Sequence, residues 1–269
     1  MTADHSWLSI RQGSAPLLVS LPHTGTDLAD LDDGRLVSRD RALRDTDWYI
    51  EQLYDFAAGL GVSVIRTTVS RTVIDVNRDP SGISLYPGQA TTGLCPLETF
   101  DGAPLYHPGR APDEAEIARR RERWFDPYHA AIAVELARLR DIHPRVVLYD
   151  CHSIRSVIPR LFDGELPNFN IGTNSGLSCA PALTEIVERA TDRFGYSSIT
   201  NGRFKGGWIT RHYGSPLMGA HAIQMELACR GYMRESEDDA PAAYDPDFAQ
   251  PMKALLTQMF EAILAFATH

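Results

Sequence analysis

Residues 146–153 read Val-Val-Leu-Tyr-Asp-Cys-His-Ser, and this stretch decides the fold class. Four large apolar or aromatic side chains run directly into Asp150 and His152. A short apolar run without polar alternation is typical of a central strand that is buried on both faces of an α/β sheet. In open α/β sheets, ligands and catalytic groups lie at the carboxyl ends of such strands. We therefore expect the strand to end near Asp150 and to present His152 at a functional edge.

A second stretch near the N-terminus repeats this pattern. Residues 16–22, Pro-Leu-Leu-Val-Ser-Leu-Pro, form an apolar run, and His23 follows it directly. Either histidine alone is equally well explained as a loop residue with ordinary hydrogen bonds. Two strands that each deliver a histidine to the same edge of one sheet are the main functional indication in this sequence.

The rest of the chain predicts strands and helices that are joined by long loops. The further expected elements are strands at 7–10, 63–68, 196–200 and 221–227 and helices over 45–56, 113–141, 181–194 and 247–267. Three segments rich in glycine and polar residues predict loops, and long loops are often functional. These loops are 79–112, 155–180 and 201–214. The sequence shows no internal repeat and no linker, so we predict one α/β domain over 1–269.

Composition excludes several classes of function. The 269 residues are 43% hydrophobic and 23% charged, with a formal net charge of −9. This charge disfavours nucleic acids and anionic membranes as partners, although a local group of arginines can still bind a small anionic substrate. A long apolar window and a secretory signal are both absent from the sequence. We expect a cytoplasmic protein without a membrane span, and the sequence carries no indication of its oligomeric state.

The four cysteines predict reduced thiols. They form no C-x-x-C pair and no regular framework, which is typical of cytosolic proteins. Cys151 and Cys229 lie in apolar stretches and are expected to be small core residues. Cys151 is flanked by Asp150 and His152, but adjacent residues on a strand point to opposite faces. A cysteine nucleophile is therefore not the favoured interpretation.

The two histidines suggest a metal site. A catalytic zinc ion commonly has three protein ligands, often two histidines and a carboxylate, and leaves one position open. The candidate carboxylates are Asp45, Asp47 and Asp150. Asp45 or Thr46 is the expected N-cap of the helix over 45–56, which places Asp47 in its first turn, within reach of the sheet edge. We favour Asp47 as the third ligand and expect Asp150, which lies two residues before His152 on the same face of the strand, to orient the His152 ring.

Glu226 is the candidate general base. It lies within Ala-Ile-Gln-Met-Glu-Leu-Ala at 222–228, and a carboxylate on such an apolar strand is costly unless it is paired or functional. The alternative is an ion pair with Arg230 or another arginine. A carboxylate next to a metal site can take a proton from water and pass it to a leaving nitrogen.

Basic residues near glycines and chain reversals are candidates for anion binding. These are Arg71, Arg78, Arg203, Lys205 and Arg211. Asn77-Arg78 follows an apolar strand and precedes Pro80, so the guanidinium is displayed where the chain turns. Arginine offers a bidentate fork that suits a carboxylate. The glycines of 202–214 favour Lys205 and Arg211, because glycine lets the backbone approach a ligand closely.

Six segments together resemble the N-formylglutamate amidohydrolase family, in order and over nearly the whole chain. They are Ser-Leu-Pro-His-Thr-Gly (20–25), Asp-Thr-Asp-Trp-Tyr-Ile (45–50), Asp-Val-Asn-Arg (75–78), Tyr-Asp-Cys-His-Ser-Ile (149–154), Asn-Phe-Asn-Ile-Gly-Thr (168–173) and the block 201–230. Each segment alone is a weak signal. Six in sequence are specific.

The resemblance implies a fold similar to that of zinc carboxypeptidases, a three-layer sandwich around a mixed, mostly parallel sheet. It also implies a zinc ion held by His23, Asp47 and His152, with Glu226 as the catalytic glutamate; other divalent ions also suit such ligands. The carboxypeptidase motif His-x-x-Glu is not matched, because Thr26 stands where its glutamate would be. The implied substrate-binding residues are Asn77, Arg78, Arg71, Arg211, Lys205 and Asn170.

The implied reaction is the hydrolysis of N-formyl-L-glutamate to formate and L-glutamate in histidine degradation. One alternative is a metal-dependent amidohydrolase that acts on another acidic N-acyl amino acid, with different pocket loops at 79–112 and 201–214. Another is a non-catalytic dicarboxylate-binding protein, which would bind its ligand without metal and would not depend on Glu226.

Overall fold

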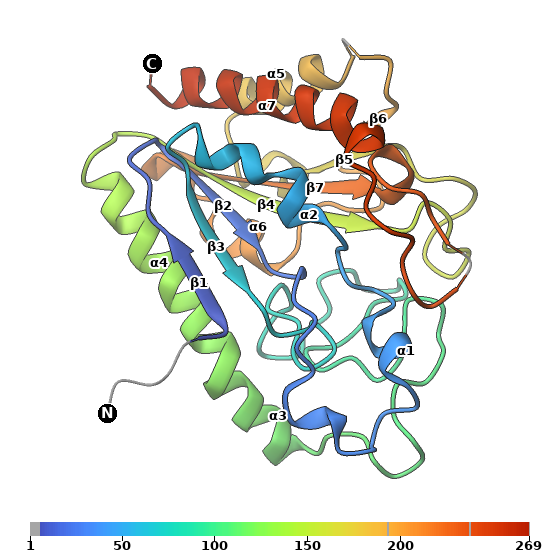
Figure 1. Ribbon diagram of the computed structural model, residues 1–269. Coiled ribbons are helices and arrows are strands. Elements are labelled where there is room, and N and C mark those ends of the chain that lie inside the picture. Colours follow the sequence, from blue (N-terminus) through green and yellow to red (C-terminus); the bar gives the residue numbers. More distant parts are fainter. Residues whose placement is uncertain (1–5, 193, 237, 269) are drawn as a thin grey trace.

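The seven strands of the computed structural model form one sheet, in the order β1-β3-β2-β4-β7-β5-β6 (Figure 1). The structure describes residues 6–192, 194–236 and 238–268, so position 193 of the helix expected at 181–194 lies outside it. The strands are β1 (Leu8–Arg11), β2 (Leu17–Leu21), β3 (Ser63–Thr67), β4 (Val146–Ile154), β5 (Phe169–Gly172), β6 (Ser198–Thr200) and β7 (Ala220–Ala228).

The sheet is mixed and mostly parallel, as expected. β2 pairs in parallel with β3 and β4, and β4 pairs in parallel with β7. The antiparallel pairs are β1 with β3 and β5 with β7. The carboxyl ends of β2, β4 and β7 therefore lie at one edge, where the long loops gather (Figure 1).

Helices cover both faces of this sheet. They are α1 (Arg39–Leu43), α2 (Ile50–Leu53), α3 (Glu114–Arg120), α4 (Asp126–Arg140), α5 (Pro181–Asp192), α6 (Trp208–Tyr213) and α7 (Pro246–Thr268). A π-helical turn at Arg121–Phe125 joins α3 to α4, and short 3-10 turns occur at Ala29–Asp32, Asp55–Ala58, Asn174–Gly176, Pro216–Met218 and Cys229–Gly231. The expected helices over 113–141 and 247–267 are thereby confirmed.

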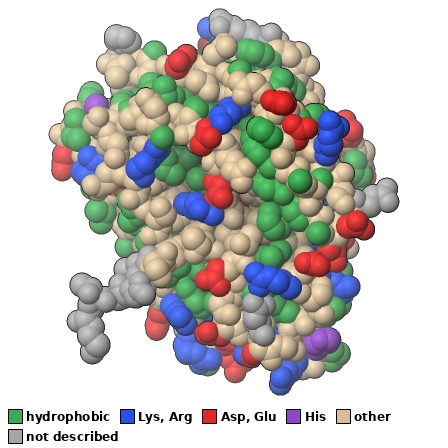
Figure 2. Space-filling view, in the orientation of Figure 1, with side chains coloured by type: hydrophobic (Ala, Val, Ile, Leu, Met, Phe, Trp, Pro, Cys, Tyr) green, Lys and Arg blue, Asp and Glu red, His purple; other side chains and the backbone are tan. Residues whose placement is uncertain are grey.

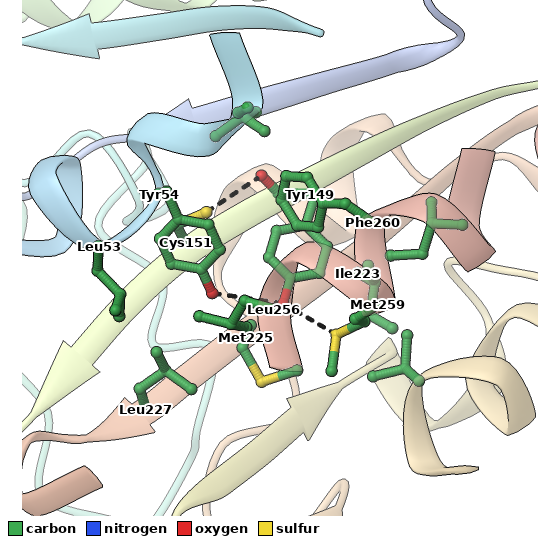
Figure 3. Packing of buried hydrophobic residues seen from close by; sticks show 14 of the residues in the cluster. Leu53, Tyr54, Tyr149, Cys151, Ile223, Met225, Leu227, Leu256, Met259 and Phe260 are labelled. Carbon is green, nitrogen blue, oxygen red and sulfur yellow. Dashed lines mark hydrogen bonds between the residues drawn. The ribbon is translucent and has the colours of Figure 1, made fainter. Parts of the chain in front are cut away.

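Alternate residues of β4 pack into two different cores. Val147, Tyr149 and Cys151 belong to the cluster that α2, α5 and α7 complete (Figure 3). Val146 and Leu148 belong to the cluster that α4 and α6 complete. The predicted three layers follow directly from this alternation, because a strand covered on both faces needs apolar side chains on both.

The cysteines behave as expected. Cys95, Cys151, Cys179 and Cys229 are all free and buried. Cys151 points into the core with Tyr149, away from the face that carries His152, and burial raises the pKa of its thiol well above the usual value. It is a core residue.

The expected helix over 45–56 is wrong in its start and its length, because α2 spans only Ile50–Leu53. The helix begins only at Ile50, after Tyr49, which adopts a left-handed conformation with φ of 62°. Neither Asp45 nor Thr46 caps it, and Asp47 lies in the turn before it rather than in its first turn. The backbone NH of Asp47 instead donates to the carbonyl of His23, at 3.0 Å, which ties this turn to the end of β2.

Two short elements lie in segments that were expected to be loops. β5 lies inside the expected loop 155–180, and α6 lies inside the expected loop 201–214. Both are too short for a periodic pattern, and tertiary contacts stabilise them: β5 pairs with β7, and α6 packs on β4 and β7. Local sequence gives little signal for such elements.

The surface carries basic and acidic side chains side by side on the face shown in Figure 2. Among the described residues, no helix is long and apolar enough to span a membrane.

Candidate active site

Three neighbouring parallel strands deliver polar side chains to one place. His23 follows the end of β2, and β4 carries Asp150 and His152. On β7, Glu226 pairs in register with His152, and Gln224 pairs with Asp150. Residues that lie directly opposite on paired strands project from the same face of the sheet. β4 continues to Ile154, so Asp150 and His152 lie within the last five residues of the strand and not after its end, where the sequence had suggested them.

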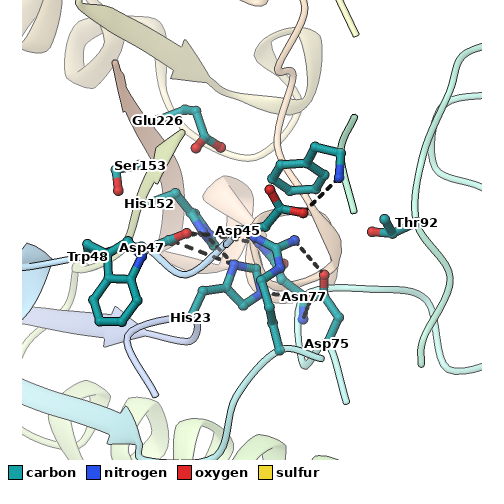
Figure 4. Close-up of polar contacts among 12 residues, drawn as sticks. His23, Asp45, Asp47, Trp48, Asp75, Asn77, Thr92, His152, Ser153 and Glu226 are labelled. Atoms are coloured by element: carbon teal, nitrogen blue, oxygen red, sulfur yellow. Dashed lines mark hydrogen bonds and ion pairs between the residues drawn. The ribbon is translucent and has the colours of Figure 1, made fainter. Parts of the chain in front are cut away.

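His23, Asp47 and His152 form a tight buried group (Figure 4). The Nδ1 atoms of the two histidines lie 3.1 Å apart. Asp47 Oδ2 lies 3.1 Å from His152 Nδ1 and 3.6 Å from His23 Nδ1. All three side chains are at most 3% exposed. Three atoms with metal-binding lone pairs thus converge on one point.

Each histidine has a second carboxylate on its other ring nitrogen. His23 Nε2 lies 2.7 Å from Asp75 Oδ1, and His152 Nε2 lies 2.9 Å from Asp150 Oδ2. A carboxylate at Nε2 favours the tautomer with the proton there and leaves the Nδ1 lone pair free. The contact between Asp150 and His152 that the sequence suggested is present. Asp75 was missed, and the available signal was a charged residue within the apolar run Val-Ile-Asp-Val at 73–76.

This donor set fits a divalent cation. In the tautomer that these two carboxylates favour, the two Nδ1 lone pairs and a carboxylate oxygen face each other without a proton between them, and a cation relieves that repulsion. Asp47 Oδ1 is also buried without a hydrogen-bond partner among the described residues. Two histidines and a carboxylate suit zinc and related ions.

Asp45 is not part of this group. Its Oδ2 accepts a hydrogen bond from the backbone NH of Phe100, at 2.7 Å, and its Oδ1 pairs with Arg155 at 3.0 Å. Asp45 therefore stabilises the loop around Phe100. Asp47 is the carboxylate that lies beside both histidines.

Glu226 is buried beside this group and forms no ion pair with the described residues. It is 7% exposed, and burial, opposed by His152, raises the pKa of its carboxyl to about 7. Gln224 Nε2 donates to it at 3.3 Å. The alternative of an ion pair with Arg230 is wrong, because Arg230 pairs with Glu165 at 3.1 Å. Within the described part of the chain, no arginine or lysine forms an ion pair with Glu226.

A cavity of about 640 Å³, its open mouth included, lies over these side chains. His23, His152 and Glu226 line it, and so do four arginines: Arg71, Arg78, Arg160 and Arg203. Phe100, Ile154, Leu161 and Phe204 supply apolar wall. A basic cavity of this kind, in a protein of net charge −9, suits a small anionic ligand with an aliphatic part.

The predicted substrate-binding residues fall into two groups, and the first lines the cavity. Arg71 Nη2 donates to Asp75 at 2.7 Å, and Arg78 donates to the carbonyl and hydroxyl of Thr92 at 3.0 and 3.1 Å. Asn77 also lines the cavity, but its amide is occupied: Nδ2 donates to Asp150 at 3.0 Å, and Oδ1 accepts from the backbone NH of Ile209 at 2.8 Å.

The second group does not line the cavity. Asn170 lies opposite Glu226 in the sheet and donates to the Glu226 carbonyl at 3.2 Å, so it supports the backbone there. Arg211 donates to the Gly206 carbonyl at 2.9 Å, and Lys205 is exposed. The structure thus brings Arg203 to the cavity in the place where the sequence had favoured Arg211 and Lys205.

Comparison with known proteins gives the family. The model of the family described as N-formylglutamate amidohydrolase matches residues 15–233, which include every residue of the buried group and Glu226. The chain belongs to the N-formylglutamate amidohydrolase family. The resemblance seen in the six sequence segments is thereby confirmed.

Two curated proteins of this kind are similar over almost their entire length. N-formylglutamate deformylase of Pseudomonas putida is 50% identical over 263 residues, which are 97% of each chain. N-formylglutamate deformylase of Pseudomonas aeruginosa is 49% identical over 260 residues, which are 96% of each chain.

Solved structures share the fold. The crystal structure of N-formylglutamate amidohydrolase from Ralstonia eutropha superposes with a TM-score of 0.81 at 25% identity and covers 97% of both chains. The gene product Atu2144 from Agrobacterium tumefaciens superposes with a TM-score of 0.69 at 16% identity, over 96% of this chain and 95% of that one. The family fold thus extends over nearly all of this chain.

Proposed function

We propose that this protein is a metal-dependent amidohydrolase that cleaves N-formyl-L-glutamate to formate and L-glutamate. The observation that carries the proposal is the buried group His23, Asp47 and His152 beside the unpaired Glu226, under a cavity lined by four arginines. The names of the two Pseudomonas relatives support the choice of substrate. We extend the proposal to the whole chain, 1–269, as one catalytic domain.

His23 Nδ1, His152 Nδ1 and Asp47 Oδ2 would hold the metal ion. Zinc is the ion that we propose for this donor set. When bound, it would polarise the formyl carbonyl and lower the pKa of an attacking water. Asp75 and Asp150 keep the two imidazole rings in the tautomer and orientation that this requires, through the Nε2 contacts at 2.7 and 2.9 Å.

Glu226 would act as the proton carrier. Its carboxylate takes the proton of the attacking water, and the same oxygen then delivers it to the nitrogen of L-glutamate as the C–N bond breaks. A pKa of about 7, raised by burial, suits both halves of this transfer, because the group can be ionised in one step and protonated in the next.

The arginines would bind the substrate as a dianion. Arg71 and Arg78 lie nearest the histidines, since both contact Asp75, which itself bonds His23. We assign the α-carboxylate of the substrate to them. A reaction of this kind would serve histidine degradation in the cytoplasm, which we include in the proposal.

The test is formate release from N-formyl-L-glutamate by the wild-type protein and by Glu226→Gln. Each is assayed as purified, after chelation, and after zinc add-back. We expect chelation to abolish activity, zinc to restore it, and Glu226→Gln to lower kcat by roughly 100-fold or more while still binding zinc. Zinc binding without formate release would refute N-formyl-L-glutamate as the substrate. Formate release that survives chelation would refute the proposed dependence on a metal ion.

N-acetyl-L-glutamate and N-formyl-L-aspartate complete the experiment. The proposal requires N-formyl-L-glutamate to have the highest kcat/KM of the three. A preference for either of the others would assign the protein to a related acidic N-acyl amino acid.

A further inference from the structure

The four arginines that line the cavity differ in their ion-pair partners. Arg71 pairs with Asp75 at 2.7 Å, Arg78 lies 3.5 Å from the same carboxylate, and Arg160 pairs with Glu98. Arg203 forms no ion pair with any described Asp or Glu. A partly buried guanidinium without a counter-ion costs free energy, and burial accordingly lowers the pKa of Arg203.

Neutral contacts hold Arg203 in a fixed position. Its Nε donates to the Leu161 carbonyl and its Nη2 to the Ala90 carbonyl, both at 2.8 Å. The guanidinium also lies 5.4 Å from the ring centroids of Tyr86 and Phe204, within cation–π range. These contacts orient the group without neutralising its charge. Nη1 has no hydrogen-bond partner among the described residues, so its two N–H groups are available to a ligand.

We propose that Arg203 is the specificity residue for the side-chain carboxylate of the substrate. The inference rests on the proposed function and goes beyond it, because it names the residue that distinguishes an acidic side chain from a neutral one. The cavity then supplies a cation for each carboxylate of a dianion. Arg203 is the one whose charge is not already compensated within the described part of the chain.

Position in the cavity assigns the side-chain carboxylate, rather than the α-carboxylate, to Arg203. The α-carboxylate is one carbon from the amide nitrogen, so it must lie close to the cleaved bond. Arg71 is 3.7 Å from Asp47 and therefore adjoins the buried group. Arg203 instead bonds the Ala90 and Leu161 carbonyls, and it forms no hydrogen bond or ion pair with the described residues of the buried group. Leu161 and Phe204 next to it offer apolar surface for the two methylene groups that separate the carboxylates.

The test compares N-formyl-L-glutamate with N-formyl-L-glutamine, which has the same shape and a neutral side chain. For Arg203→Met we expect kcat/KM for the glutamate substrate to fall roughly 100-fold, and kcat/KM for the glutamine substrate to change by less than about threefold. Arg203→Lys keeps the charge but loses the fixed fork, so its loss on the glutamate substrate should be intermediate. An equal loss on both substrates would overturn the inference.

Two controls distinguish a structural effect of the substitution, failure of the proposed function and failure of the inference about Arg203. Thermal unfolding and zinc content of Arg203→Met, matched to the wild-type protein, exclude a merely structural effect. If the wild-type protein releases no formate from either substrate, the proposed function fails, and calorimetric binding of glutarate then decides about Arg203. Weaker glutarate binding to Arg203→Met than to the wild-type protein supports the inference, and equal binding overturns it.

Discussion

Asp75 contacts three ionisable groups of the site, namely His23, Arg71 and Arg78. Its Oδ1 accepts from His23 and from the backbone NH of Asn77, and its Oδ2 accepts from Arg71. Burial would raise the pKa of Asp75, but Arg78, His23 and Arg71 outweigh it and hold the pKa well below the usual value. Asp75 therefore stays ionised and couples the histidine of the metal site to the arginines of the cavity.

Replacing Asp75 with asparagine should weaken metal binding by about 10- to 100-fold, because His23 Nε2 then bonds a neutral amide oxygen in place of a carboxylate, which makes the imidazole a weaker ligand. Competition with a chromophoric zinc chelator measures the affinity. The matched control is Asp79→Asn, since the hydrogen bonds of the Asp79 carboxylate to described residues stay within its own turn, at Ser81. Unchanged zinc affinity in Asp75→Asn would contradict the role that we assign to the carboxylate at His23 Nε2.

At the scale of elements, the N-terminus of α6 packs closely against the active site. A Cβ on Gly207, the N-cap of α6, would lie 2.5 Å from Asn77 Nδ2. Asn77 in turn bonds Asp150 and the first turn of α6 at Ile209. The short helix, the asparagine and the carboxylate that orients His152 thus form one packed unit.

Gly207→Ala should destabilise the fold by about 1–3 kcal/mol and lower activity, because the added methyl group displaces the Asn77 amide. Gly59→Ala is the control, since a Cβ there meets its nearest neighbour at 3.5 Å, an ordinary contact. Urea unfolding and formate release measure the two effects. If both alanine variants lose the same stability, the close approach at Gly207 is not the cause.

Helix α4 carries a histidine that makes stability depend on pH. His129 lies between Phe125 and Tyr213, and its Nε2 donates to the Val76 carbonyl at 2.8 Å. Burial lowers the pKa of His129 from 6.5 to about 4. Between these values the folded protein binds fewer protons than the unfolded chain at this site, so the free energy of unfolding rises with pH through that window.

Unfolding in urea at about pH 7.5 and about pH 5 tests this effect. The His129 contribution should be fully present at the higher pH, and about 1–2 kcal/mol of it should be lost at the lower pH. His129→Gln keeps a donor for the Val76 carbonyl but cannot titrate, so its difference between the two pH values should be smaller by that amount. An identical difference in both proteins would show that His129 does not titrate in this range.

At the scale of the whole molecule, the metal site joins distant parts of the chain. His23 and His152 are separated by 129 positions, and Asp47 precedes His152 by 105. Because a cation bound there stabilises only the folded state, its binding free energy adds to the free energy of unfolding.

Removal of the metal by chelation should therefore lower the unfolding temperature. At a zinc concentration about 100 times the dissociation constant, the stabilisation is about 2.7 kcal/mol. Scanning calorimetry of chelated and zinc-loaded protein measures the shift. His23→Ala serves as the control, because zinc should then have little effect on its unfolding temperature. An equal zinc-induced shift in His23→Ala would place the binding elsewhere.

The sequence by itself determined the central strands and the two histidines. The apolar runs at 16–21 and 146–149 are long enough to identify buried strands, and an ionisable residue beside such a run is costly unless it has a function. The same reasoning identified Glu226. The helices at 113–141 and 247–267 were predictable because their periodic pattern covers many turns.

Only the tertiary structure decided the partners of these residues. Asp75 bonds His23 from 52 positions away, and Arg203 reaches the carbonyl of Ala90 across 113 positions. The apolar run around Asp75 indicates a buried carboxylate but not its partner, and no local pattern distinguishes Arg203 from Arg211. The chain positions them through strand register and loop packing, and these are set by burial of the two cores together rather than by neighbours in sequence.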